Sequence, residues 1–194
     1  MKLCVFQGSF NPIHNAHLRV ADFVRDNYDF DKILFIPAFC PPHKDRGMAE
    51  HRFEMVKLAA ENHSVFDVSD IEYKRGGKSY TYLTIKELYE TYDIEPPISF
   101  IIGTDAFEKI ESWYEADKLK ELVKFLVFIR EYNFDISRYD YLKGKGYNFE
   151  FQKLPYKDIS STELRNKINA GRDISGLVPE KVKEYIEKHG LYKS

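Results

Sequence analysis

Two histidines three positions apart, His14 and His17, stand just after a short apolar run at residues 3–6. Gly8 lies between the run and the histidines, and a glycine lets the backbone approach a ligand closely. In a parallel α/β sheet, ligands bind where strands end, and the free N–H groups at the start of the next helix attract anions. The spacing therefore predicts that both imidazoles face those N–H groups and bind phosphate oxygens. From spacing alone, a capping histidine followed by a solvent-facing one is an equally good interpretation.

A second anion-binding pattern, residues 159–165, lies near the other end of the chain and reads Ile-Ser-Ser-Thr-Glu-Leu-Arg. Ser160 or Ser161 can cap a helix that begins there. Arg165 falls one turn into that helix, so its guanidinium can reach back toward oxygens held at the helix start. Taken alone, the pattern is also that of an ordinary serine-capped helix with a surface arginine. Together, the two patterns indicate a protein that handles the phosphates of a nucleotide.

Two further polar sites follow apolar strand patterns. Gly103-Thr104-Asp105 comes directly after residues 98–102, and a carboxylate there can accept hydrogen bonds from ribose hydroxyls. A helix-capping aspartate is the alternative, and both can be true. Arg130 ends the next strand pattern, where its planar guanidinium can stack on adenine.

The elements that must position these residues alternate between strand and helix. Short continuous apolar runs predict strands of a parallel sheet covered on both faces, and apolar residues at three-to-four spacing predict helices between them. Strands are expected at residues 2–6, 32–37, 66–73, 98–102, 125–130 and 149–151. Helices are expected at residues 18–28, 50–61, 82–92, 119–123, 160–170 and 179–190, and residues 131–147 show no clear pattern.

This alternation predicts a Rossmann-like α/β fold, a doubly wound parallel sheet with C-terminal helices, in one domain over residues 1–194. The 29 basic and 31 acidic residues give a net charge of −2, which argues against a broad nucleic-acid surface. No apolar stretch reaches the length that crosses a bilayer, and no signal-peptide layout is present, so we expect a cytoplasmic protein. Cys4 and Cys40 are expected to be core thiols, without a disulfide or a metal.

Residues 8–17, Gly-Ser-Phe-Asn-Pro-Ile-His-Asn-Ala-His, resemble the signature of the nucleotidyltransferase superfamily that has a His-x-Gly-His motif. Residues 159–165 resemble the second signature of that superfamily, Ile-Ser-Ser-Thr-x-x-Arg. Within it, the chain is similar to bacterial nicotinate-nucleotide adenylyltransferases from end to end, less so over residues 131–147. The stretches that carry this narrower likeness are residues 41–44, 51–55, 79–81, 101–105, 113–114 and 179–192.

The resemblance implies an enzyme that joins nicotinate mononucleotide to ATP. The mononucleotide phosphate would attack the α-phosphorus of ATP in line, so positioning and charge stabilisation suffice without an enzyme nucleophile. Catalytic roles are implied for His14, His17 and Arg165. Mg²⁺ is implied, bound mainly through the ATP phosphates and with no dedicated metal site in the protein. The implied ATP-binding residues are Gly8, Ser9, Phe10, His14, His17, Gly103, Asp105, Arg130, Ile159, Ser160, Ser161, Thr162 and Arg165.

Recognition of the mononucleotide is implied for an aromatic group and a basic loop. An aromatic plane suits a pyridine ring, and backbone amides beside it can bind a ring carboxylate. For Trp113, a place at the edge of the core is the alternative. The implied residues are His43, Lys44, Ser79, Tyr80, Thr81, Trp113 and Tyr114.

The chain departs from the family pattern at two places. Ala16 replaces the glycine of the His-x-Gly-His signature, which adds a methyl group where the ligand is expected. Residues 38–40, Ala-Phe-Cys, replace a segment in which the family has an asparagine that contacts substrate. The second departure bears on how the acceptor is held.

Alternatives remain at the level of the acceptor and of the class. The same chemistry on nicotinamide mononucleotide or phosphopantetheine is the nearest one, and a non-catalytic nucleotide-binding protein is another. An NAD-dependent dehydrogenase is excluded, because no Gly-x-Gly-x-x-Gly follows the first strand. The expected partners are the small molecules ATP and nicotinate mononucleotide, with neither nucleic acid nor membrane, and a homo-oligomer is left open.

Overall fold

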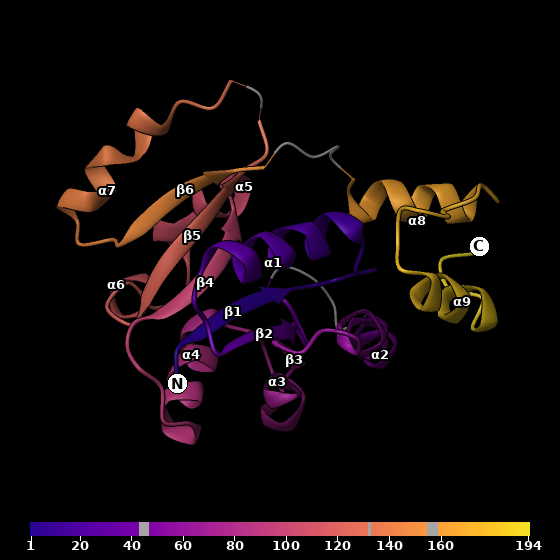
Figure 1. Ribbon diagram of the computed structural model, residues 1–194, viewed down its shortest axis with the longest axis horizontal. Helices are drawn as coiled ribbons and strands as arrows, with labels where there is room; N and C mark the ends of the chain where they lie inside the picture. Colours follow the sequence, from indigo (N-terminus) through magenta and orange to yellow (C-terminus); the bar gives the residue numbers. More distant parts are fainter. Residues whose placement is uncertain (43–46, 132, 155–158) are drawn as a thin grey trace.

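The computed structural model describes residues 1–42, 47–131, 133–154 and 159–194. Within these residues, a sheet of six parallel strands has the order β3-β2-β1-β4-β5-β6 (Figure 1). Its strands are β1 Leu3–Gly8, β2 Lys32–Pro37, β3 Phe66–Val68, β4 Ile98–Gly103, β5 Val123–Ile129 and β6 Phe149–Lys153. The predicted Rossmann-like, doubly wound parallel sheet is confirmed.

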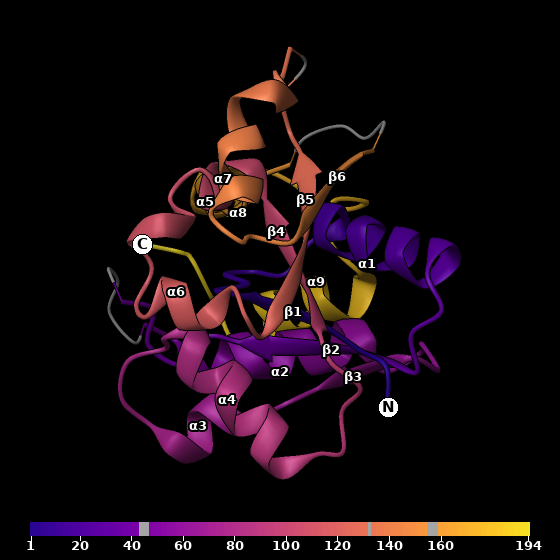
Figure 2. The same ribbon diagram turned by 90° about the vertical axis from the view of Figure 1, so that its left-hand side faces the viewer.

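Helices cover both faces of the sheet (Figures 1 and 2). One face carries α1 Asn15–Asn27, α2 Ala49–Ala60, α8 Ser161–Asn169 and α9 Glu180–Lys188. The other carries α3 Ile71–Arg75, α4 Thr81–Thr91, α5 Thr104–Phe107, α6 Ala116–Leu119 and α7 Asp140–Gly144, with short 3₁₀ helices at Ile110–Ser112 and Ile136–Tyr139. In the described part of the chain, none of the helices combines the length and the apolar character needed to span a membrane.

The strands are continuously apolar because their side chains alternate between two hydrophobic cores. In β1, Cys4 and Phe6 belong to the core shared with α1 and α2. Leu3 and Val5 belong to the core on the opposite face, shared with α4 and α6. A strand buried on both faces leaves no polar side, so the sequence shows a run rather than an alternation.

The order of the strands reverses between β1 and β4, which pair so that Cys4 lies beside Ser99 and Val5 beside Phe100. From β1 the chain enters α1 on one face, whereas from β4 it enters α5 on the other. The chain therefore diverges beyond Gly8 and Gly103. Doubly wound sheets bind their ligands in the crevice that such a divergence leaves.

Two element predictions are wrong. Of the strand expected at residues 66–73, only Phe66–Val68 pairs with β2, and the chain then turns into α3. The Ser69 hydroxyl accepts a free N–H at the start of that helix, which favours the turn. The helix expected at residues 119–123 is the end of α6 followed by β5, because the apolar residues from Val123 onward pair with β4.

The C-terminal helices follow the sequence expectation. Ser160 caps α8 and forms a capping box with Glu163, and Pro179 precedes α9. α9 packs against α2, so the last helices lie on the same face of the sheet as α1. The segment without a clear pattern, residues 131–147, contains a 3₁₀ helix and α7 among its described residues.

Candidate active site

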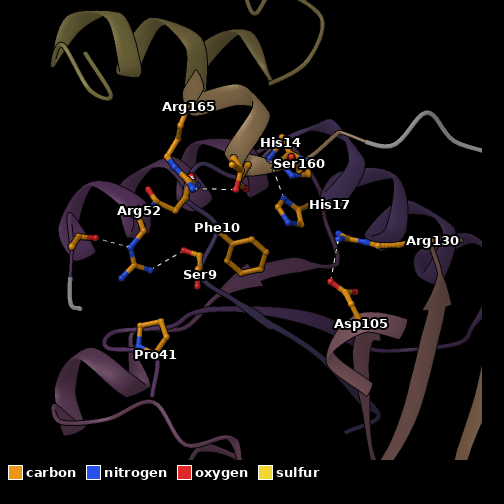
Figure 3. A pocket seen from close by; sticks show the side chains of 14 residues that line it. Ser9, Phe10, His14, His17, Pro41, Arg52, Asp105, Arg130, Ser160 and Arg165 are labelled. Carbon is orange, nitrogen blue, oxygen red and sulfur yellow. Dashed lines mark hydrogen bonds and ion pairs between the residues drawn. The ribbon is translucent and has the colours of Figure 1, made fainter. Parts of the chain in front are cut away.

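A pocket of about 530 Å³ opens at the carboxyl ends of β1, β4 and β5 (Figure 3). The segment after β1, the N-termini of α1 and α8, and side chains that follow β4 and β5 form its walls. The described lining is rich in nitrogen donors and holds one carboxylate, so it suits an anion. These residues include His14, His17, Arg52, Arg130, Arg165 and the carboxylate of Asp105.

The two histidines lie at the start of α1, where His14 is the N-cap and His17 stands in the first turn. The backbone N–H of His14 donates to His17 Nδ1 at 3.2 Å, and the rings stack with centroids 3.7 Å apart. His14 is 1% exposed, and its Nδ1 is buried without a hydrogen-bond partner. Most buried polar atoms are paired, so an unpaired one beside a pocket is expected where a ligand binds.

Both imidazoles are neutral near pH 7. Burial, and then the charge of Arg130, lower the pKa of His14 to about 4. Burial, followed by His14 and Arg130, lowers the pKa of His17 well below its usual value. Because His17 Nδ1 accepts a hydrogen bond, the ring proton is on Nε2. His17 can therefore offer a ligand an uncharged N–H donor.

The second sequence motif meets the first directly. Arg165 Nη1 donates to the carbonyl of Asn11 at 2.8 Å, and Ser161 Oγ donates to the carbonyl of Pro12 at 2.9 Å. Arg165 Nη2 also donates to Thr162 Oγ1 at 3.2 Å. The structure thus brings the two motifs to one pocket, although they lie about 150 residues apart in the chain.

Two neighbours of these motifs act from outside the pocket. The hydroxyl of Tyr192 donates to Asn11 Oδ1 at 2.7 Å, so the C-terminal segment holds the loop that precedes the histidines. Ile159 is 8% exposed and packs in the core beside α1. Its side chain does not line the pocket, so a contact between Ile159 and ATP would come from its backbone.

A smaller cavity of about 120 Å³ shares lining residues with the pocket, Arg130 among them. A Cβ atom on Gly103 would lie 3.0 Å from Asp105 Oδ1, so a larger residue at Gly103 would displace the Asp105 carboxylate. The charged groups of Asp105 and Arg130 are 3.8 Å apart. Ala16, which stands in place of the signature glycine, is 3% exposed and lines this cavity, so its methyl group narrows it.

The turn after β1 contributes its backbone more than its side chains. Phe10 is 2% exposed and adopts a positive φ of 46°. A Cβ atom on Gly8 would lie 3.1 Å from the Phe10 ring, so a larger residue at Gly8 would displace that ring. Ser9 lines the pocket and presents its carbonyl to a buried arginine of α2.

The sequence motifs assign no role to that arginine, Arg52. It is 2% exposed, and it holds together the chain segments at this end of the sheet. Its guanidinium donates to the backbone carbonyls of Ser9 (2.8 Å), Ala38 (2.7 Å), Phe39 (3.2 Å) and Gly47 (3.0 Å). One buried cation therefore joins the segment after β1 to the segment after β2. A signal was present in the sequence, because Arg52 lies one turn before Val56 on the inward stripe of its helix.

The aromatic residues expected at the mononucleotide form a group outside the lining of the pocket. Tyr80 stacks on Tyr114 with ring centroids 4.5 Å apart, and Tyr114 is 47% exposed. Trp113 is partly buried and meets the ring of Phe100 edge-on at 6.2 Å. The tryptophan thus stands at the edge of the core, and its chain neighbour Tyr114 is the exposed member of the tyrosine pair.

Of the other expected acceptor residues, Ser79 and Thr81 are engaged within the protein. Ser79 Oγ accepts the N–H of Cys40 at 2.9 Å, and the N–H of Ser79 donates to the Cys40 carbonyl at 2.8 Å. Thr81 is the first residue of α4, and its hydroxyl donates to Oε1 of Gln7, near the end of β1, at 2.7 Å. His43 and Lys44 lie outside the described residues.

A parallel doubly wound sheet with an anion-binding pocket at its switch point defines an α/β nucleotide-binding protein. A family model described as cytidylyltransferase-like matches residues 5–167 of the chain. The chain therefore belongs to the cytidylyltransferase-like family of nucleotidyltransferases. The superfamily predicted from the two signatures is confirmed.

Relatives that match over their full length show which members of this family the chain is similar to. A probable nicotinate-nucleotide adenylyltransferase of Fusobacterium nucleatum is 40% identical, over 97% of this chain and 98% of the relative. A protein of the same description from Clostridium tetani is 40% identical over 99% of both chains. Among solved structures, Plasmodium falciparum nicotinic acid mononucleotide adenylyltransferase complexed with NaAD is similar, with a TM-score of 0.78 and 26% identity, over 98% of this chain and 97% of that chain.

Proposed function

We propose that the protein transfers AMP from ATP to nicotinate mononucleotide, giving nicotinate adenine dinucleotide and pyrophosphate for NAD biosynthesis. The observation that carries the proposal is the direct contact between the two phosphate-binding motifs, where Arg165 bonds to Asn11 beside the histidines. The full-length relatives described as nicotinate-nucleotide adenylyltransferases support the identity of the acceptor.

In this reaction an oxygen of the mononucleotide phosphate attacks the α-phosphorus of ATP. The new P–O bond forms as the bond between the α-phosphorus and the oxygen bridging to the β-phosphate breaks. Pyrophosphate leaves with that electron pair. A phosphate monoester is largely ionised at pH 7, so no side chain has to remove a proton from it. The protein contributes positioning and stabilisation of charge.

We assign the α-phosphoryl group to the histidines. His17 would donate its Nε2–H to an oxygen of that group as negative charge builds there, an effect of the oxyanion-hole kind. Its low pKa suits this role, because a neutral donor can hold the oxygen throughout the reaction without transferring a proton. His14, stacked on His17, would contact the same phosphates.

We assign the β- and γ-phosphates to the start of α8, where Ser160, Ser161 and Thr162 line the pocket with Arg165. Arg165 and Ser161 also bond to the turn before the histidines, which would fix the distance between the two phosphate sites. Gripping the leaving pyrophosphate is the catalytic contribution that this geometry supports for Arg165.

We assign adenosine to the smaller cavity. Asp105 would accept hydrogen bonds from ribose hydroxyls, and the Arg130 guanidinium would stack on the base. Gly8 and Gly103 line this cavity and have no side chain to fill it, which leaves room for a flat ring, while Ser9 lines the adjoining larger pocket.

We assign the pyridine ring to the aromatic group of Trp113, Tyr80 and Tyr114, and its carboxylate to free backbone N–H groups near them. Thr81 supports this placement, because it opens α4 and the first N–H groups of a helix have no partner within the helix. His43 and Lys44, which are expected on the loop after β2, would reach the mononucleotide phosphate.

We propose that Mg²⁺ arrives on the triphosphate and supplies charge neutralisation there. Among the described residues that line the pocket, Asp105 is the sole carboxylate, and because it is assigned to the ribose, the metal would be held mainly by the phosphates and by water. No cluster of three or more His, Cys, Asp or Glu residues suited to a metal occurs in the described residues.

A cytoplasmic location with small-molecule partners completes the proposal. Cys4 and Cys40 are not joined by a disulfide, which suits a reducing compartment. ATP and the mononucleotide are the partners that the pocket supports, since its described lining is built for anions.

The test is an assay of pyrophosphate release with ATP and either the acid or the amide mononucleotide. We expect turnover with both and a clear preference for the acid. A preference for the amide would reject the proposed acceptor, and no release with either would reject the proposed reaction.

A further inference from the structure

A buried carboxylate outside the pocket bonds to β1, to α4 and to the segment that follows β2. Glu72 of α3 is 1% exposed, and its oxygens accept hydrogen bonds from three different elements. Gln7 Nε2 of β1 donates to Oε1, as does Thr84 Oγ1 of α4 at 2.7 Å. The backbone N–H of Phe39, just after β2, donates to Oε2 at 3.0 Å. Charge balance comes from Arg75, whose Nη2 is 3.8 Å from Oε1.

The donors around Glu72 set the direction of a longer chain of hydrogen bonds. Because the amide nitrogen of Gln7 faces Glu72, its carbonyl oxygen faces the other way, toward α4. Thr81 Oγ1 donates to that oxygen at 2.7 Å. The first residue of α4 is thus held to the end of β1, and α3 and α4 lie together on one face of the sheet (Figure 2).

The segment Ala38–Cys40 is held on both sides. Glu72 accepts the N–H of Phe39, while Arg52 donates to the carbonyls of Ala38 and Phe39. The remaining backbone groups of the segment bond to Gly8 and Ser79. Two buried side chains of opposite charge therefore fix this segment relative to β1, and the segment leads into the loop that carries the expected basic pair.

We propose that Glu72 is a positioning residue for the acceptor mononucleotide, an inference that rests on the proposed function. It orients Gln7, and through Gln7 the N-terminus of α4, while its other oxygen orders the segment after β2. Both elements belong to the acceptor side, and Glu72 contributes nothing to the lining of the phosphate pocket. Its loss should therefore weaken acceptor binding more than ATP binding.

The substitution Glu72→Gln tests this with little change in shape. A glutamine replaces one oxygen by an NH₂ group, which then faces an N–H or O–H donor. At a buried site such a mismatch leaves a donor unpaired, and we expect it to change an equilibrium constant about tenfold, which is about 1.4 kcal/mol. Glu87→Gln is the matched control. The Glu87 carboxylate shares Arg75 with Glu72 and accepts a hydrogen bond from it at 2.8 Å, but it bonds neither to Gln7 nor to the segment Ala38–Cys40.

Steady-state kinetics with nicotinate mononucleotide and ATP give the readout. In Glu72→Gln we expect the KM for the mononucleotide to rise about tenfold, with the KM for ATP changed less than about twofold. Glu87→Gln should leave both KM values unchanged. An unchanged acceptor KM, or equal rises in both KM values, would overturn the assignment.

A second variant keeps the test decisive if Glu72→Gln fails to fold, as judged by circular dichroism. Thr81→Val keeps the size of the side chain and breaks the link to Gln7 without changing Gln7, which lines the cavity assigned to adenosine, so the acceptor KM should again rise more than the ATP KM. Equal KM values in Thr81→Val and the wild type would then refute the inference. Wild-type protein that forms no dinucleotide would instead reject the proposed function itself.

Discussion

The pocket that contains His14 and His17, to which we assign the ATP phosphates, lies at the same edge of the sheet as the segment Ala38–Cys40. The two regions use their polar groups in opposite ways. In the pocket, His14 Nδ1 is buried without a partner. In the segment, every backbone N–H and carbonyl has a partner within the protein, supplied by Gly8, Arg52, Glu72 and Ser79. The pocket keeps donors for a ligand, whereas the segment has none left to offer from its backbone.

This difference separates two kinds of function. Groups that stay unpaired are suited to bind a substrate and to follow its changing charge. Groups that are fully paired give a rigid support, because each bond opposes movement of the segment. Substitutions in the pocket should therefore change turnover, and substitutions around the segment should change stability and substrate affinity.

The largest effect is expected at His17. Replacing it by alanine removes an uncharged donor from the reacting phosphate and should lower kcat by a factor on the order of 10² or more. His63→Ala, whose ring stacks on Phe66 away from the pocket, is the control and should keep near-normal turnover. Equal kcat values in His17→Ala and His63→Ala would contradict the contrast between the pocket and the segment.

Arg52→Met should act mainly on the fold. Methionine keeps an apolar stem but leaves the carbonyls of Ser9, Ala38 and Phe39 without their buried donor, so the free energy of unfolding should fall by about 2–3 kcal/mol. Because Arg52 touches the segments after β1 and β2, both KM values should rise, unlike the acceptor-specific effect expected for Glu72→Gln. Urea unfolding and steady-state kinetics, with the exposed Arg19→Met as control, would show whether this contrast holds.

A smaller effect concerns stability against pH. The pKa of His14 is about 4 in the folded protein against 6.5 for the free group, so between these values the unfolded chain binds the proton more readily. Stability from this group is present above pH 6.5 and declines as the pH falls toward 4. Between pH 7 and pH 5 the loss should be about 2 kcal/mol. Urea unfolding of wild type and His14→Gln at both pH values measures it, and an equal loss in the two proteins would contradict the burial argument.

The sequence predicts the parts of the molecule that rest on local pattern. Continuous apolar runs locate β1, β2 and β4, and serine and proline mark the starts of α8 and α9. The two motifs to which we assign the phosphates meet as expected, because strand ends and helix starts gather at one edge of a parallel sheet.

What the sequence does not predict depends on contacts between distant residues. Arg52 and Glu72 are charged, and charged residues are rarely fully buried unless paired, so their residue type assigns both to the surface, even though Arg52 lies on the inward stripe of its helix. Their partners lie 43 and 65 residues away in the chain, at Ser9 and Gln7. The turn into α3 is missed partly for a similar reason. Ser69 favours the turn locally, but Glu72 is also held there by Gln7 and by the segment after β2.

The bond from Tyr192 to Asn11 has a consequence for the order in which the protein matures. A ribosome releases the loop ahead of the histidines among the first residues, and its tyrosine partner among the last that the structure describes. The strands can pair before that tyrosine emerges, whereas the core beside α1 is completed only when Ile186 and Leu191 join it. The site proposed for the triphosphate would then be the last part of the molecule to become ordered. A nascent chain shorter than 192 residues would fold without the bond that holds the loop before the histidines.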